Sequence, residues 1–150
     1  MSSTKRIFVA VEDRFLAETI GNAKKRLVYA APGVGMLSAR ALVDAINRLS
    51  GQVTIILDAD PEVCRIGYGD PEALQILHRS ACEQQLPLRR QAGLRIWVLV
   101  ADDLVLAWSP IARSVEPERQ SEQPNGLVLD GTPADVCATA MAAEDTSVLP

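Results

Sequence analysis

The chain is poor in the residues that most often mark a function at first sight. Aromatic residues make up 4% of its 150 residues, and His78 is the one histidine. A hydrolase triad or dyad would have to use His78, and no nucleophile stands at a motif spacing from it, so we do not expect such chemistry. Every apolar run is shorter than the roughly 18 residues of a membrane-crossing helix, so we expect no membrane partner.

Cysteine is also scarce, with Cys64, Cys82 and Cys137 alone in the chain. An odd number without close spacing argues against a disulfide framework and against a zinc site, and it favours reduced thiols. The N-terminal stretch reaches Glu12 and Asp13 too soon for a signal peptide. We therefore expect a cytoplasmic protein, and no motif in the sequence calls for a cofactor.

The composition is that of a globular domain, with 48% hydrophobic and 23% charged residues. At this length the chain forms about one domain with one core. The net charge of −4 is unevenly spread, because residues 1–115 carry 14 basic and 12 acidic residues, whereas 116–150 carry one basic and seven acidic residues. A mildly basic body with an acidic tail leaves nucleic-acid binding open without favouring it.

Short buried apolar runs alternate with amphipathic helices along the first hundred residues. The helices carry apolar residues at i, i+3, i+4 and i+7, and the runs between them are rich in β-branched residues. This alternation predicts an α/β layered sandwich with a mainly parallel central sheet flanked by helices. The expected strands cover 6–11, 27–31, 53–57, 94–101 and 104–109, and the expected helices cover 14–26, 39–49 and 71–84.

The pattern weakens toward the C-terminus. Residues 115–126 are polar and contain proline, which predicts a loop, and 127–129 predict an edge strand. We expect one domain over 1–131, followed by a tail or terminal helix over 132–150. The weakly patterned end is compatible with truncation from a longer chain.

Two candidate sites follow expected strands, where ligands of parallel α/β sheets usually bind. Gly33 and Gly35 lie between a strand and a helix, so their backbone could approach a phosphate; alternatively they serve a turn that needs positive φ angles. Asp58, Asp60 and Glu62 follow the next strand and could hold a hard divalent cation. Each of these acids could instead cap a turn or the following helix.

The third candidate site is the apolar stretch 94–109, which contains Arg95 and predicts two strands joined by a turn at Asp102 and Asp103. Together with the order of elements, it resembles the phospholipase D-like superfamily, whose members carry H-x-K-x-x-x-x-D on a strand and a following G-S-x-N turn. Asp102 matches the aspartate and Ser109 the serine. The segments Asp-Pro-Glu-Val (60–63) and Gly-Tyr-Gly (67–69) are similar to those of an uncharacterised bacterial subgroup.

The match departs from the motif at the residues that carry the chemistry. Arg95 stands at the histidine position, Trp97 at the lysine position and Ile111 at the asparagine position. The resemblance implies a histidine nucleophile and a phosphate-binding lysine, and arginine cannot replace the histidine because it stays protonated. The resemblance therefore implies the fold and argues against phosphodiester cleavage.

Two interpretations of Arg95 and Trp97 remain open. They face the same side of the strand and could line a relic pocket for an anion or a flat ligand, together with Asp102 and Ser109. Alternatively, Trp97 fills the pocket and Arg95 pairs with an acid such as Asp102 or Asp103.

Three functions follow from these observations. The first is a catalytically inactive phospholipase D-like domain that serves as a structural or interaction module. The resemblance implies paired motif copies, and so a homodimer or further domains of a longer chain. The second is a phosphate- or nucleic-acid-binding domain that uses the relic site around Arg95, with Arg89 and Arg90 nearby. The third is a metal-dependent enzyme that uses Asp58, Asp60 and Glu62.

Overall fold

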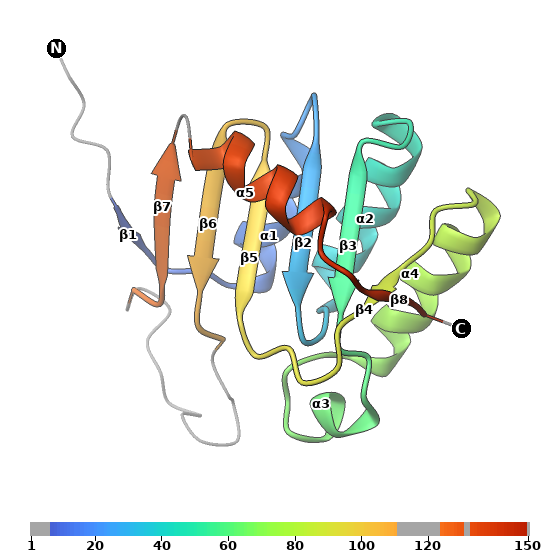
Figure 1. Ribbon diagram of the computed structural model, residues 1–150. Coiled ribbons are helices and arrows are strands. Elements are labelled where there is room, and N and C mark those ends of the chain that lie inside the picture. Colours follow the sequence, from blue (N-terminus) through green and yellow to red (C-terminus); the bar gives the residue numbers. More distant parts are fainter. Residues whose placement is uncertain (1–6, 111–123, 131–132, 150) are drawn as a thin grey trace, which may run out of the picture.

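A single eight-stranded sheet organises the protein, and helices lie on both of its faces (Figure 1). The computed structural model describes residues 7–110, 124–130 and 133–149. The strands are β1 (Phe8–Val9), β2 (Leu27–Ala31), β3 (Val53–Leu57), β4 (Arg89–Arg90), β5 (Trp97–Ala101), β6 (Leu104–Trp108), β7 (Gly126–Asp130) and β8 (Ser147–Val148). The helices are α1 (Asp13–Gly21), α2 (Met36–Arg48), α3 (Pro61–Arg65), α4 (Pro71–Glu83) and α5 (Pro133–Ala142).

The expectation of a mainly parallel sheet is wrong. The strand order is β1-β7-β6-β5-β2-β3-β4-β8, and only the β2–β3 and β3–β4 pairs are parallel. The other pairs are antiparallel. The reason is the two-residue turn between β5 and β6, since a connection this short can only join antiparallel strands. The α/β class and the helices on the sheet faces are confirmed.

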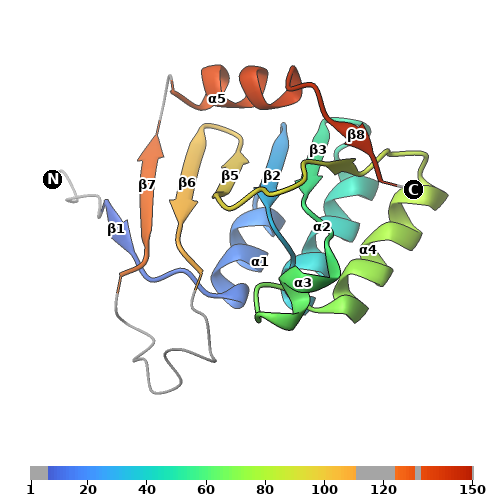
Figure 2. The ribbon, with the colours of Figure 1, turned by 60° about the horizontal axis from the view of Figure 1, so that its bottom comes forward.

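Helices α1, α2 and α4 cover one face of the sheet, and α5 covers the other (Figure 2). Helices α1, α2 and α4 pack side by side over the larger apolar core, which includes Ile20, Leu42, Leu77 and Leu99, all fully buried. Helix α5 packs on the opposite face against a smaller apolar cluster that includes Val100. Alternation of side chains along β2, β5 and β6 supplies both clusters.

The expected helix starts and ends are partly displaced. Helix α1 ends at Gly21, five residues before the expected end, while α4 lies within one residue of the expected helix 71–84. Helix α2 begins at Met36 rather than at 39, with Gly35 as its N-cap. The side chain that satisfies its first turn comes from elsewhere: the Asp13 carboxylate accepts hydrogen bonds from the Leu37 and Ser38 backbone N–H groups at 2.8 and 3.0 Å.

The C-terminal part of the chain joins the sheet more fully than its sequence indicates. Strand β7 is an inner strand, since it pairs with both β6 and β1, and the expected edge position is wrong. Within 132–150, α5 packs on the sheet and β8 pairs with β4. Most of the loop expected over 115–126 lies outside the described residues.

The described residues contain no helix long and apolar enough to cross a membrane. All three cysteines are free.

Candidate functional site

The stretch that resembles the phospholipase D motif forms a hairpin in the middle of the sheet. Strands β5 and β6 pair in register from Trp97 opposite Trp108 to Ala101 opposite Leu104, with Asp102 and Asp103 in the turn. This arrangement confirms the two expected strands and their turn. Because β5 runs antiparallel to β2, its first residues lie beside the carboxyl ends of β2 and β3. Arg95 and Trp97 thereby lie at the edge of the sheet where both candidate glycines and Asp58 are found.

Asp102 holds the hairpin turn against the segment before β2. Its carboxylate accepts hydrogen bonds from the backbone N–H groups of Lys24, Lys25 and Arg26, at distances of 2.7 to 3.2 Å. Partial burial alone would raise the pKa of this carboxyl, but the three N–H donors outweigh burial and the pKa lies below its ordinary value. Asp102 also has a positive φ of 54°, which aspartate and asparagine tolerate better than most residues.

Replacing Asp102 should therefore lower stability in a pH-dependent way. We expect Asp102→Ala to lower the free energy of unfolding by about 1.5 kcal/mol at pH 7, since three N–H groups lose their acceptor. Asp102→Asn should cost less, because it keeps one acceptor oxygen and the turn conformation. Urea denaturation measures both.

The pH dependence follows from the lowered pKa. A carboxyl whose pKa is depressed by folding contributes stability above its unfolded value, about 4, and loses it as the pH falls through the folded value. The wild type should thus approach the Asp102→Asn variant in stability below about pH 4. Asp103→Asn is the matched control, since the Asp103 side chain is 74% exposed. Equal losses in the two asparagine variants would contradict the assignment.

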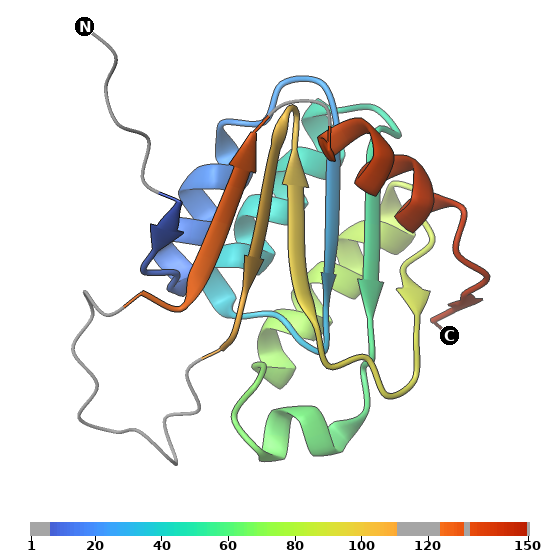
Figure 3. The same cartoon turned by 60° about the vertical axis from the view of Figure 1, so that its left-hand side comes forward.

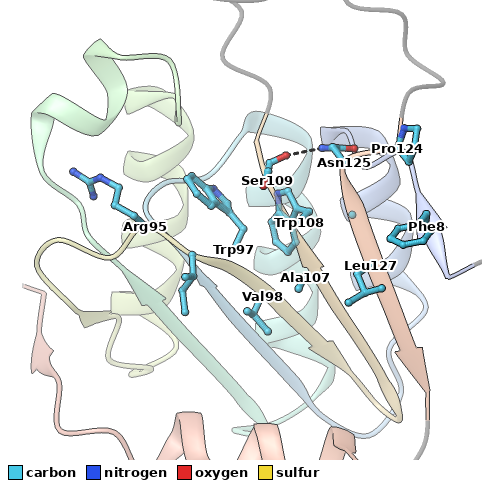
Figure 4. Close-up of a pocket in the computed structure, with 12 residues that line it drawn as sticks. Phe8, Arg95, Trp97, Val98, Ala107, Trp108, Ser109, Pro124, Asn125 and Leu127 are labelled. Carbon is cyan, nitrogen blue, oxygen red and sulfur yellow. Dashed lines mark hydrogen bonds between the residues drawn. The ribbon is translucent and has the colours of Figure 1, made fainter.

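Arg95 pairs with an acid, but not with either acid of the turn. Its guanidinium contacts the Asp58 carboxylate at 2.5 Å, and Asp58 is 2% exposed. Arg95 also donates a hydrogen bond to the Leu94 carbonyl oxygen at 2.7 Å. Figure 4 shows the guanidinium pointing away from the two tryptophans of the hairpin. The acid that pairs with Arg95 is therefore not Asp102 or Asp103 but Asp58, which follows β3, the strand on the far side of β2.

Trp97 packs against the loop before α4. Its ring lies 5.2 Å from the Tyr68 ring, centroid to centroid, with the planes at 75° in an edge-to-face arrangement. The cross-strand neighbour Trp108 lies 6.2 Å from Tyr29. These side chains line a cavity of about 430 Å³ beyond the carboxyl end of β2, which we call the strand-end cavity. Trp97 thus fills part of this region without closing it.

Ser109 follows β6 and lies apart from Asp102, which is at the other end of the hairpin. The Ser109 carbonyl oxygen accepts a hydrogen bond from the Asn125 amide at 2.7 Å. The same amide exchanges hydrogen bonds with the Val11 backbone, at 2.6 and 3.0 Å. Asn125 therefore ties the ends of β6, β7 and β1 together, a role that its loop position in the sequence did not indicate. Ile111, at the asparagine position of the motif, lies outside the described residues.

A second pocket, of about 530 Å³, lies next to the hairpin, and we call it the sheet-face pocket (Figure 4). A row of four apolar residues lines it, one from each of the adjacent strands β1, β7, β6 and β5, and each residue is the cross-strand partner of the next. They are Phe8, Leu127, Ala107 and Val98. This row lies on the α5 side of the sheet, at the end that α5 leaves open (Figure 3). Phe8 is 70% exposed.

The expectation of positive φ angles at Gly33 and Gly35 is wrong, and close packing accounts for both glycines instead. A Cβ on Gly33 would lie 2.8 Å from the Tyr68 carbonyl oxygen and 3.1 Å from the Gly69 Cα. A Cβ on Gly35 would lie 2.6 Å from the Asp13 carboxyl carbon. Both glycines therefore allow neighbouring segments to approach the start of α2. Phosphate binding by this loop stays a prediction.

The three candidate metal ligands each have a partner within the protein. Asp58 pairs with Arg95, Asp60 accepts the Glu62 backbone N–H at 2.9 Å as the N-cap of α3, and Glu62 pairs with Arg65. In the described part of the chain, no group of three or more His, Cys, Asp or Glu side chains is placed to hold a metal ion. Asp60 thus has the capping role that the sequence left open, whereas Asp58 and Glu62 form ion pairs that the sequence did not indicate.

Asp13 is a site residue that the sequence analysis did not identify. Its carboxylate accepts hydrogen bonds from the first turn of α2 and from the Ser38 hydroxyl, the latter at 2.5 Å. It also lines the strand-end cavity. Its position before one helix gave no signal of contact with another.

Comparison of the sequence finds no matching family model and no significantly similar curated protein. The fold, in contrast, is similar to solved structures. The phospholipase D family member Nuc from Salmonella typhimurium matches with a TM-score of 0.65 and 16% identity, over 93% of this chain and 91% of Nuc. The archaeal chromatin protein TrmBL2, whose structure shows a mode of DNA binding, matches with a TM-score of 0.64 and 13% identity, over 98% of this chain and 54% of TrmBL2.

Identities this low establish a common fold and nothing about activity. The coverage of Nuc extends over nearly the whole of both chains, so the likeness concerns the entire sheet and its helices rather than one supersecondary unit. The chain therefore has a phospholipase D-like α/β fold, with a mixed sheet between two layers of helices.

Proposed function

We propose that this protein is a non-catalytic domain with a phospholipase D-like fold that serves as an interaction module and pairs with a second copy of itself. The absence of catalysis is supported by the contacts of the two replaced motif positions. Arg95 has no basic nitrogen free to attack phosphorus and is paired with Asp58. Trp97 packs against Tyr68 where the motif has a phosphate-binding cation.

The observation that carries the interaction role is the apolar row of the sheet-face pocket. Four adjacent strands each contribute one apolar residue to it, and the outermost, Phe8, is largely exposed. Ile96 adds a 60% exposed side chain to the lining of the same pocket. Contiguous apolar surface of this kind marks interaction sites, because association removes it from water.

Self-association gives the direct test. We expect light scattering over a range of concentrations to show a dimer, and we expect Phe8→Asp to shift the protein to a monomer. The shift arises because an aspartate in the interface would have to lose its hydration. Val136→Asp is the matched control, since Val136 is 66% exposed on α5 and does not line the sheet-face pocket.

Two outcomes would contradict the proposal. A monomer at every concentration would exclude pairing through this surface, and so would equal dissociation by Phe8→Asp and Val136→Asp.

The non-catalytic part of the proposal is tested separately with a phosphodiester such as bis(p-nitrophenyl) phosphate. Turnover by the wild type that Arg95→Ala or Trp97→Leu abolishes would show that the replaced positions still carry chemistry.

The second candidate is nucleic-acid binding through Arg95, Arg89 and Arg90, and the DNA-binding neighbour TrmBL2 supports it. The contacts of these arginines weaken it, since Arg95 pairs with Asp58 and Arg89 donates a hydrogen bond to the Ala142 carbonyl oxygen. Anisotropy of a labelled oligonucleotide at low and high salt decides the matter. Salt-dependent binding that Arg95→Ala weakens would support this candidate, and no binding at low salt would remove it.

A further inference from the structure

The aromatic residues of this chain are few, yet most of them gather at one place. The sequence contains two tryptophans, two tyrosines and two phenylalanines. Both tryptophans and both tyrosines line the strand-end cavity: Tyr29, Tyr68, Trp97 and Trp108. They come from three strands and one loop, so neither a single amphipathic element nor a local repeat explains their convergence.

The four rings form two adjoining pairs on the face of the sheet that α1, α2 and α4 cover. Trp97 and Trp108 are direct cross-strand partners, and each packs against a tyrosine, Tyr68 or Tyr29 respectively. Trp108 is 8% exposed and Tyr29 2%, and the Tyr29 hydroxyl donates a hydrogen bond to the Gly33 carbonyl oxygen at 2.9 Å. The wall of the cavity is therefore built of aromatic rings that are already held in position.

Carboxylates complete the lining. Glu12, Asp13 and Asp70 line the same cavity, and none of the described residues that line it is Lys, Arg or His. The negative charge acts on at least one of the rings. The pKa of the Tyr29 hydroxyl is raised, mainly by burial and further by the charge of Asp13. An anion would meet repulsion here, whereas a cation would meet three carboxylates in a cavity lined by aromatic rings.

We propose that the strand-end cavity binds a small organic cation of the alkylated ammonium class. Such cations are weakly hydrated, and aromatic rings attract them through the ring quadrupole while carboxylates supply charge. A bare metal ion fits less well, because Asp13 and Asp70 already accept backbone N–H groups with their oxygens. The cavity volume of about 430 Å³ lies in the range of small-molecule sites. This inference does not depend on pairing of two copies through the sheet-face pocket.

Tetramethylammonium chloride is the probe, with tert-butanol as an uncharged molecule of similar shape and sodium chloride as the control for ionic strength. Both tryptophans line this cavity and also the sheet-face pocket, so their fluorescence reports binding at either place and the variants below assign it to one of them. Calorimetry gives the affinity. We expect saturable binding of tetramethylammonium alone. Trp97→Leu and Tyr68→Leu should each weaken it about fivefold or more, while Phe8→Leu, which removes an aromatic ring outside this cavity, should leave it unchanged.

The charge contribution has a closely matched pair of variants. Asp70 and Asp60 are both N-caps followed by proline, and each accepts the N–H of the glutamate two residues on, at 2.9 Å. Asparagine caps helices as well as aspartate, so both Asp→Asn changes keep the cap and remove one charge. Asp70→Asn should weaken binding about threefold or more, and Asp60→Asn, outside the cavity, should not.

Three results would overturn the proposal. They are equal responses to tetramethylammonium and tert-butanol, absence of saturable binding up to high millimolar concentration, and equal effects of Asp70→Asn and Asp60→Asn. Asp70→Asn preserves the fold through its cap, so the charge test holds even where a leucine variant fails to fold. A monomeric protein that binds tetramethylammonium would reject the pairing proposal and keep this one.

Discussion

Arg95→Ala is expected to lower the free energy of unfolding by about 2 kcal/mol, because it leaves a buried carboxylate without its partner. Asp58 is 2% exposed and Arg95 is its ion-pair partner, although the arginine side chain itself is 46% exposed. That exposure keeps the expected loss below the range typical of fully buried pairs. Urea denaturation of the wild type and the variant at pH 7 measures it.

A double-mutant cycle separates the ion pair from other effects of the substitution. In the Arg95→Ala background, Asp58→Asn should restore part of the lost stability, since it removes the unpaired charge and keeps the shape of the side chain. Arg65→Ala is the matched control, because Arg65 pairs with Glu62 on the surface, where ion pairs contribute little. Losses that simply add in the double variant would show that Arg95 and Asp58 are not coupled.

This ion pair also bears on the proposed non-catalytic function. In the resembled family a histidine at this position acts on phosphorus, whereas Arg95 here turns toward Asp58 at the end of β3. The buried aspartate needs a cation, and arginine can meet it while keeping part of its guanidinium in water. The contact with Asp58 gives Arg95 a structural role, and this supports the proposed non-catalytic function.

The sequence predicted local structure well and long-range partners poorly. The hairpin of 94–109 was predictable because two apolar runs flank a turn, and turn chemistry is a local property. The partner of Arg95 was not predictable, because the nearest acids in sequence are Asp102 and Asp103. The true partner, Asp58, lies 37 residues away and is brought close only by the pairing of β5 with β2 and of β2 with β3.

The prediction of a mainly parallel sheet failed for a related reason. Alternation of strands and helices is found along the first three strands, and β2 and β3 are indeed parallel. The hairpin of β5 and β6 breaks the alternation, and β7 then adds to its free side. The short turn at Asp102 and Asp103 was itself the signal that antiparallel pairing begins there.

The aromatic residues of the strand-end cavity are visible in the sequence, but their convergence cannot be predicted without the strand order. Tyr29, Trp97 and Trp108 lie within or at the ends of apolar runs, and Tyr68 lies in the Gly-Tyr-Gly segment. Once the strand order is known, these positions converge at one edge of the sheet. Because the chain has few aromatic residues, their convergence at one cavity points more strongly to a function for that cavity.

Gly33→Ala is the second substitution with a large expected effect, about 3 kcal/mol of lost stability. The added Cβ would lie 2.8 Å from the Tyr68 carbonyl oxygen and 3.0 Å from a methyl carbon of Val63. The first of these atoms belongs to the backbone, so it cannot move aside by a change of rotamer. Strain must therefore spread into the loop that carries Tyr68. Thermal and urea denaturation measure the loss.

Gly21→Ala provides the matched control, because a Cβ on Gly21, the last residue of α1, would meet no atom within 4 Å. Alanine there should leave stability unchanged or raise it slightly.

The same pair of variants tests the alternative role of Gly33 in phosphate binding. A Gly33→Ala protein that kept its stability but lost stabilisation by inorganic phosphate would favour a phosphate loop, whereas a large loss of stability in the absence of phosphate would assign Gly33 to packing against Tyr68.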